Sequence, residues 1–109
     1  MPEARLAAGI WVSAYLRRLQ AEMIPAYVPA RGDETAGAVL VKLALLDGTA
    51  RLFHRQYDLM TGAGGWVVLM DGPETEVDAL WRREQARDPD VWVVEIESRE
   101  GRHLLGTEG

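Results

Sequence analysis

The sequence predicts a single α+β domain over residues 1–109, a two-layer sandwich in which two helices pack on one face of a mainly antiparallel sheet of about four to five strands. Three observations favour this fold. The chain has 109 residues, 48% of them hydrophobic, which is enough for one core. Apolar residues recur at helical spacing in two segments, and short Val- and Leu-rich runs between turn residues fill most of the rest. The order helix, several strands, helix and strand is typical of α+β domains.

The first helix is expected to begin near residue 6 and to end before Pro25, which disfavours helical geometry at the preceding residue. Its apolar stripe recurs every three or four residues, at Val12, Leu16, Leu19 and Met23. Trp11, Tyr15 and Arg18 lie on another side of the same helix. These three side chains either cover the rim of the core or form a strip that contacts a partner.

The triplet Arg31-Gly32-Asp33 follows, and it is predicted to turn the chain into the central strand "AVLVKLALL". The triplet is not a P-loop, because it leads into a strand and lacks the Gly-Lys-Ser/Thr ending. An adhesion role would need an extracellular display loop, and nothing in the sequence indicates secretion. Arg31 and Asp33 are kept as candidate binding residues beside this structural interpretation.

Asp47-Gly48 lies between two strand-like runs and predicts a two-residue type I′ hairpin turn. The register of that turn sets Leu43 opposite Leu52 on a face expected to be buried. The opposite face is then expected to be exposed. It carries the basic and aromatic candidates for binding a partner: Lys42, Arg51, Phe53, Arg55 and Tyr57.

The second half of the chain predicts a glycine-rich loop over residues 58–65, a strand over 66–70 and a helix over 72–87. Asp88-Pro89 is expected to stop this helix. In the last strand, the side chains alternate between two faces. One face carries Trp92, Val94 and Ile96, and the other carries Val91, Val93, Glu95 and Glu97.

Composition limits the classes of function. With 12 Lys and Arg against 17 Asp and Glu, the net charge of -5 disfavours nonspecific nucleic-acid binding. The apolar segment 6–16 is too short to span a bilayer, and the absence of cysteine suits the cytoplasm. Neither His54 nor His103 has metal-site or catalytic spacing, so no metal site, catalytic residue or cofactor is predicted.

Four motifs occur here in an order similar to that of a small bacterial family, the domain of unknown function 1491. The motifs are "WVSAYLRR", "RGDETAGAVLVK", "DGTARLF" and "DPDVWVVEIESREGRH", and the resemblance covers nearly the whole chain. It implies a single-domain intracellular protein, but it implies no mechanism.

The residues favour a small noncatalytic binding or adaptor module that uses the basic and aromatic face, or a sheet edge, to hold a protein partner. A nucleic-acid-binding module is an alternative, because arginines beside aromatic rings suit bases as well. A small enzyme with a site near the Arg31–Asp33 turn is another, and its mark would be a pocket joining that turn to His54 or Arg83. Homo-oligomerisation through an aromatic surface also stays open.

Overall fold

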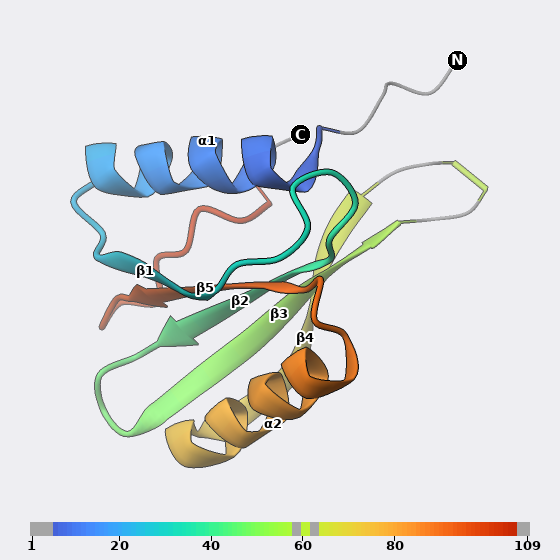
Figure 1. The fold of residues 1–109 in the computed structure, drawn as a ribbon. Coiled ribbons are helices and arrows are strands. Elements are labelled where there is room, and N and C mark those ends of the chain that lie inside the picture. The colour runs from blue at the N-terminus through green and yellow to red at the C-terminus, as the bar shows by residue number, and fades with distance from the viewer. Residues whose placement is uncertain (1–5, 58–59, 62–63, 107–109) are drawn as a thin grey trace.

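The computed structural model describes residues 6–57, 60–61 and 64–106 and contains two helices and five strands (Figure 1). In chain order these are α1 (Ala8–Ala21), β1 (Ala26–Ala30), β2 (Val39–Ala44), β3 (Thr49–Tyr57), β4 (Gly64–Pro73), α2 (Glu74–Arg87) and β5 (Trp92–Glu97). The predicted α+β class and the number of strands are confirmed. Within the described residues, neither helix is long and apolar enough to cross a membrane.

The five strands form one sheet in the order β1-β5-β2-β3-β4, so the last strand of the chain lies between the first two. β5 runs parallel to β2, and the other three neighbouring pairs are antiparallel. The sheet is therefore mixed and mainly antiparallel, as predicted. β1 and β4 form its two edges.

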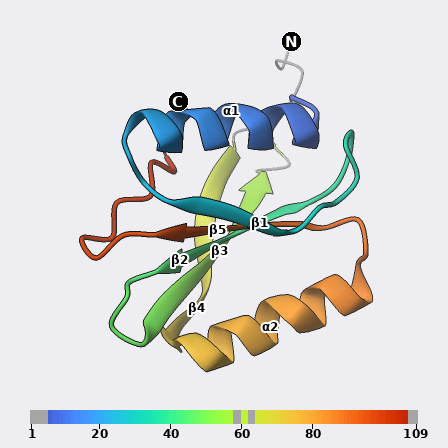
Figure 2. The ribbon, with the colours of Figure 1, turned by 60° about the vertical axis from the view of Figure 1, so that its left-hand side comes forward.

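The helices lie on opposite faces of the sheet, so the prediction that both pack on one face is wrong (Figures 1 and 2). On one face, α1 packs Val12, Tyr15 and Leu19 against a cluster that contains Val41, Leu43, Phe53, Val94 and Ile96. On the other, α2 packs Val77 and Trp81 against a cluster that contains Leu40, Leu52 and Val93. The central strands are apolar on both faces, and each apolar face needs a covering layer.

The β2–β3 hairpin has a three-residue loop, Leu46-Asp47-Gly48, in place of the predicted two-residue turn. Ala44 pairs with Ala50, and the Leu45 N–H donates to the Thr49 carbonyl at 3.1 Å. One Asp47 carboxylate oxygen accepts hydrogen bonds from the Thr49 N–H at 2.9 Å and from its hydroxyl at 2.6 Å. The extra loop residue shifts β3 by one position relative to the predicted register.

This shift changes every cross-strand pair of the hairpin. Val41 lies opposite Phe53, and Leu43 lies opposite Arg51, where the predicted partner was Leu52. A slip of one residue turns each side chain of a strand to the other face. The predicted composition of the two sheet faces is therefore wrong for β3 relative to β2. In β5, which carries no such loop, the predicted alternation of Trp92, Val94 and Ile96 against Val93 and Glu95 is confirmed.

Replacing Gly48 with Val is expected to destabilise the protein by about 1 kcal/mol or more, because Gly48 has a φ of 89°. A Cβ at this position would meet no atom within 4 Å, so the cost would come from the backbone. Gly72→Val is the matched control, since a Cβ there also meets nothing within 4 Å and Gly72 is not among the positive-φ residues. Urea unfolding of both variants measures the difference, and equal midpoints would contradict this account of the turn.

Candidate functional site

The predicted basic and aromatic face is divided between the two sides of the sheet. Lys42 lies on the α2 side and is only 2% exposed, whereas Phe53 lies on the α1 side and is 7% exposed. Arg51 and Arg55 lie on the Phe53 side, because alternate residues of a strand share a face. The expectation that these residues form one exposed face is wrong, and the one-residue shift of the hairpin is the reason. The side chain of Tyr57 lies outside the described residues.

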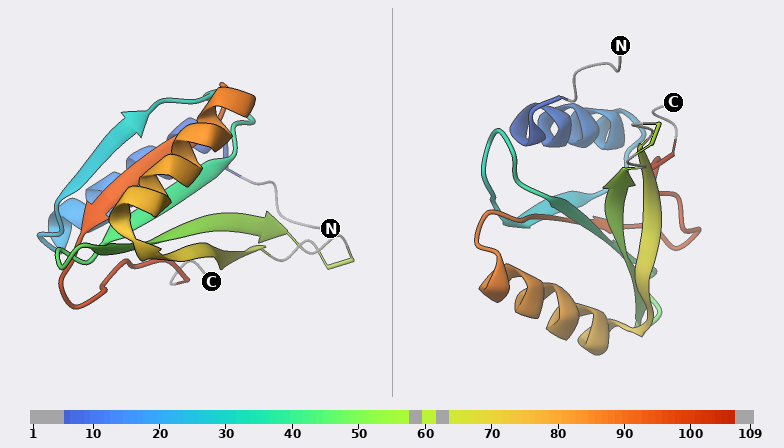
Figure 3. Two further views of the ribbon diagram at one scale, coloured as in Figure 1. Left: turned by 90° about the horizontal axis from the view of Figure 1, so that it is seen from below. Right: turned by 90° about the vertical axis from the view of Figure 1, so that its right-hand side faces the viewer.

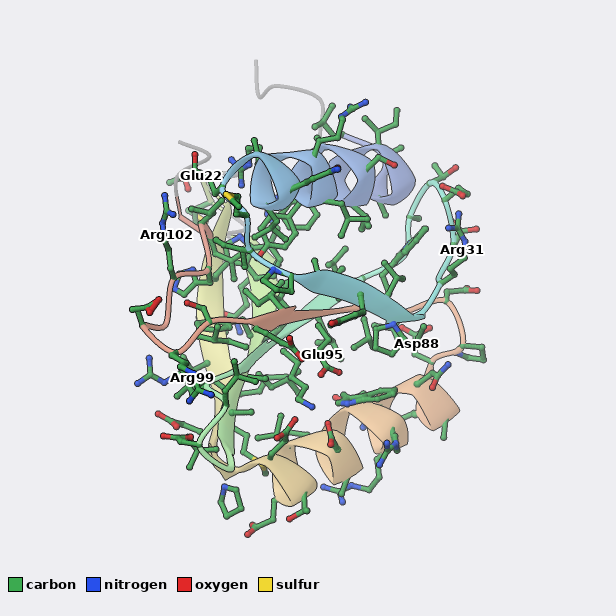
Figure 4. All side chains as sticks on the ribbon, turned by 90° about the vertical axis from the view of Figure 1, so that its left-hand side faces the viewer. Glu22, Arg31, Asp88, Glu95, Arg99 and Arg102 are labelled. Carbon is green, nitrogen blue, oxygen red and sulfur yellow. The ribbon has the colours of Figure 1, made fainter. Side chains whose placement is uncertain are left out.

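Lys42 is the centre of an ion-pair network that attaches α2 to the sheet. Its Nζ lies 2.7 Å from a carboxylate oxygen of Glu74, 2.7 Å from one of Asp78 and 3.5 Å from one of Glu95. Glu95 points from β5 toward α2 (Figure 4). The Trp81 indole N–H donates to the same Asp78 oxygen at 3.0 Å. Three carboxylates thus surround one buried ammonium group.

The network shifts the pKa values of Lys42 and Asp78 in opposite directions. Burial lowers the pKa of Lys42, but the hydrogen bonds to Asp78 and Glu74 outweigh burial, and the net shift is upward. Burial raises the pKa of Asp78, but hydrogen bonds from Lys42 and Trp81 outweigh it, and the net shift is downward. The Asp78 contribution to stability is lost as pH falls through its lowered pKa. The Lys42 contribution is lost as pH rises through its raised pKa.

The Arg31–Asp33 turn packs against the segment that leads into β5. The Asp33 N–H donates to the Asp90 carbonyl at 2.9 Å, and the Trp92 indole N–H donates to the Asp33 carbonyl at 2.8 Å. A Cβ on Gly32 would lie 2.1 Å from the Asp90 carbonyl oxygen, so glycine is required by this close backbone contact. The triplet is a structural turn, as its sequence predicted.

The side chains of this turn make mainly local contacts. One Asp33 carboxylate oxygen accepts hydrogen bonds from the Thr35 and Ala36 N–H groups at 3.1 and 2.7 Å. Arg31 extends outward (Figure 4), where it pairs with Glu34 at 2.9 Å. The carboxylate of Asp33 therefore stabilises the turn, and the guanidinium group of Arg31 remains exposed.

A groove of about 490 Å³ lies beside this turn, under the N-terminal end of α1. We call it the Trp11–Trp66 groove. Its lining comes from four parts of the chain: Leu6, Ala8 and Trp11 at the start of α1, residues 35–39 before and within β2, Arg55 of β3 and Trp66 of β4. The ring centroids of Trp11 and Trp66 are 5.3 Å apart, and the Arg55 guanidinium carbon lies 5.9 Å from the Trp66 centroid.

The groove exists because β2 and β3 diverge at its base. Their pairing ends at Leu40 and His54, after which β3 continues with Arg55 opposite Trp66 of β4. The β3–β4 hairpin thereby rises beside α1 (Figure 3). The start of β2 is instead held by β5, since Val39 pairs with Trp92. The groove occupies the space that opens between β2 and β3 beyond the Leu40–His54 pair.

The roof of the groove is fixed by contacts between α1 and the turn. The Ala8 and Gly9 N–H groups donate to the carbonyls of Thr35 and Glu34 at 3.2 and 2.8 Å. A Cβ on Gly9 would lie 1.7 Å from a Glu34 carboxylate oxygen, so glycine permits this approach. Two of the helix's first N–H groups, which lack partners within the helix, are satisfied in this way.

Two residues that the sequence analysis considered for partner binding line the groove: Arg55 of the predicted basic and aromatic face, and Trp11 of the predicted helix strip. Trp66 was missed, because its meeting with Trp11 joins positions 55 residues apart and has no local signal. Tyr15, a member of the other predicted strip, is 1% exposed, and its hydroxyl donates to the His103 carbonyl at 2.7 Å. Tyr15 therefore packs with the core, which for this residue confirms the interpretation that the strip covers the core rather than contacts a partner.

The histidines lie apart from the groove lining. His54 is on the α2 side of β3, with its Nε2 3.3 Å from the Gln56 amide nitrogen. His103 packs on Phe53, and its Nδ1 accepts a hydrogen bond from the Leu105 N–H at 2.9 Å. Burial, with a smaller effect of Arg51, lowers the pKa of His103. Over the described residues, no group of three or more His, Asp or Glu side chains is arranged so that it could hold a metal ion.

A protein-family model described as "protein of unknown function (DUF1491)" matches residues 6–106. Two solved structures of a DUF1491 family protein from Caulobacter crescentus, one by crystallography and one by NMR, are 42% identical with TM-scores of 0.82. The crystal structure alignment covers 93% of each chain, and the NMR alignment covers 95% of this chain and 96% of the other. A solution structure from A. tumefaciens is 34% identical over 94% of this chain and 93% of that chain, with a TM-score of 0.78. A comparison with curated proteins finds no match.

Lys42→Met is expected to destabilise the protein by about 3 kcal/mol at pH 7, because it leaves three clustered carboxylates without their cation. The cost should shrink near pH 3, where carboxylates take up protons. Arg51→Met is the control, since its pair with Asp71 is exposed and contributes less than about 1 kcal/mol. Denaturant unfolding at both pH values makes the comparison. A Lys42→Met cost that does not change with pH would contradict the electrostatic role.

Proposed function

The chain belongs to the DUF1491 family, whose description assigns no activity. We propose from the geometry that the protein is a noncatalytic binding module, which holds a protein partner in the Trp11–Trp66 groove. The observation that carries this proposal is the lining of the groove. Two tryptophans and several aliphatic side chains surround a single guanidinium group, Arg55. Pockets that bind ligands combine an apolar wall with a few placed polar groups in this way.

The lining favours binding over catalysis. Of the described residues that line the groove, Arg55 alone carries a charged side chain, and none is a histidine, a serine or a carboxylate. General acid–base and nucleophilic steps need such groups within reach of the substrate. The enzyme alternative requires a pocket that joins the Arg31–Asp33 turn to His54 or Arg83, and neither of those two residues lines this groove.

Charge favours a protein partner over a nucleic acid. The chain carries a net charge of -5, which repels a phosphate backbone, and a single arginine in the groove gives little local compensation. Tryptophan and arginine are the residues that contribute most at protein interfaces. The groove therefore has the composition of a site that binds a protein.

We place this binding module in the cytoplasm of a bacterium. The absence of cysteine suits a reducing compartment, and the similar solved structures come from C. crescentus and A. tumefaciens.

Photo-crosslinking in the producing cell tests the proposal. The photoreactive residue p-benzoylphenylalanine is installed in place of Thr35, which lines the groove and is exposed. The control replaces Arg83, which is exposed on α2 and does not line the groove. We expect one discrete protein adduct from position 35 and none from position 83. The adduct should survive RNase and should disappear when Ala36→Trp fills the groove.

Other outcomes identify other functions. Equal labelling from both positions, or no adduct from position 35, would contradict a partner in the groove. A nuclease-sensitive adduct would favour the nucleic-acid alternative, and an adduct of twice the chain mass would favour self-association.

A further inference from the structure

We infer that residues 98–106 form a strap that neutral His103 holds over the core under α1, and that acid releases this strap by protonating the imidazole. We call this segment the 98–106 strap. None of its residues lines the Trp11–Trp66 groove, so the inference does not depend on the proposed function. Four features support it: a fixed turn at the start of the strap, an apolar anchor, a hydrogen bond to neutral His103 and the cations around that ring.

The strap begins at a turn that follows β5. The Ser98 N–H donates to the Ala44 carbonyl at 3.0 Å, which attaches the start of the strap to β2. The Gly101 and Arg102 N–H groups donate to the carbonyl and the hydroxyl oxygen of Ser98 at 3.1 and 3.0 Å. Gly101 has a φ of 74°, a conformation that glycine favours. Residues 98–102 are therefore held by contacts that do not involve His103.

Beyond this turn, the strap rises toward α1 (Figures 1 and 4). The Tyr15 hydroxyl donates to the His103 carbonyl at 2.7 Å, and an Arg18 guanidinium nitrogen donates to the Leu104 carbonyl at 3.2 Å. Leu105 is 6% exposed and belongs to the same apolar cluster as Tyr15. Leu105 is therefore the apolar anchor of the strap.

His103 holds this anchor in place through its neutral form. Its Nδ1 accepts the Leu105 N–H at 2.9 Å, and its ring packs on Phe53 with the ring centroids 5.0 Å apart. A backbone N–H can only donate, so Nδ1 must carry no proton in this arrangement. In the imidazolium form both ring nitrogens donate, and the Leu105 N–H loses its acceptor. Protonation therefore acts on the residue that anchors the strap.

The elements around His103 contribute cations. Arg51 of β3 acts on the ring, Arg18 of α1 donates to the carbonyl of the next residue, and Arg102 precedes His103 in the chain. The Tyr15 phenol, whose ordinary pKa is about 10, is neutral at neutral and acid pH. Burial of the ring, with a smaller effect of Arg51, lowers the pKa of His103.

The carboxylates of these surroundings are paired with arginines. Asp71 lies 3.0 Å from Arg51, and Glu22, at the end of α1, pairs with Arg102. Each carboxylate therefore offsets the charge of its own arginine first. An imidazolium at His103 is left with burial and repulsion, which favour its transfer to water.

The direction of the pH effect follows from this pKa shift. A released histidine takes up its proton near the ordinary pKa of about 6.5, whereas the held ring takes it up only at lower pH. Between these two values the released state binds more protons. The contribution of His103 to holding the strap is complete above about pH 6.5 and is lost as pH falls below it.

Release uncovers apolar surface on the α1 side of the sheet. Phe53 is 7% exposed and Tyr15 is 1% exposed while the strap is in place. Tyr15 also stacks on Trp11, with the ring centroids 4.8 Å apart. The strap is thus connected, through its hydrogen bond from Tyr15, to one wall of the groove.

Thiol labelling of Leu105→Cys measures release, because the chain has no cysteine of its own. The labelling rate with a dipyridyl disulfide, divided by the rate for an unstructured peptide of the same sequence at the same pH, gives the opening equilibrium. We expect this equilibrium to rise by up to about ten-fold between about pH 7.5 and about pH 5.5, which lies about one unit below the pKa of a released histidine.

Two controls assign the effect. His103→Asn in the same background keeps an acceptor for the N–H two residues on, as in an Asx turn, but does not titrate, so its labelling should not change with pH. Val94→Cys, at a fully buried position of β5, reports unfolding of the whole domain and should be labelled more slowly than Leu105→Cys at both pH values.

Amide hydrogen exchange in the unsubstituted chain repeats the measurement without a change at the anchor. The protection of the Leu105 amide, corrected for the intrinsic exchange rate at each pH, should fall over the same interval, while that of the Val94 amide should not. This measurement decides the question if Leu105→Cys does not fold.

Three results would overturn the inference. Labelling of Leu105→Cys that does not change with pH would show that the anchor stays in place, even if exchange of the Leu105 amide increased. An equal pH dependence in His103→Asn would assign the effect to other groups. An equal increase at Val94 would show that acid unfolds the whole domain.

Discussion

The register between β2 and β3 determines which layer each central side chain joins. With three residues in the loop, Val41, Leu43 and Phe53 face α1, whereas Leu40, Lys42 and Leu52 face α2. A loop one residue shorter would send Leu52 toward α1 and Phe53 toward α2. Both cores, the ion-pair network and the side of the sheet on which Arg55 lies therefore depend on this one loop length. The Asp47 carboxylate, which binds both donor groups of Thr49, closes the loop in this geometry.

Lys42 determines where α2 attaches to the sheet. A buried ammonium group without partners is strongly unfavourable, and Glu74 and Asp78 lie one helical turn apart, so both reach it from the same side of α2. Glu95 reaches it from the neighbouring strand. Apolar packing by Val77 and Trp81 would tolerate small shifts of the helix along the sheet. The hydrogen-bonded ammonium group tolerates far less, so the network specifies the position that the apolar contacts stabilise.

Local sequence patterns were enough to predict the helices and strands. The features that were not predicted depend on contacts between residues that are far apart in the sequence. The alternation of Trp92 to Glu97 was enough to assign both faces of β5. Asp-Gly occurs in hairpin loops of two residues and of three residues, so the dipeptide alone could not determine the register between β2 and β3. The predicted basic and aromatic face, which includes Arg51 and Phe53, depended on that register. The apolar runs of β2 and β5 are buried on both sides, a pattern that indicates helices on both faces of a sheet more strongly than on one. Arg55 was identified as a site residue, but its neighbour Trp66 was not, because no pattern in a single sequence indicates which rings meet.

The groove follows from unequal strand lengths, since β3 has nine residues and β2 has six. The part of β3 beyond β2 cannot be held by sheet pairing on that side, and the Trp11–Trp66 contact joins the hairpin to α1 instead. The same two rings that hold the hairpin also form a wall of the groove. Support of the hairpin and the proposed binding of a partner therefore use the same residues.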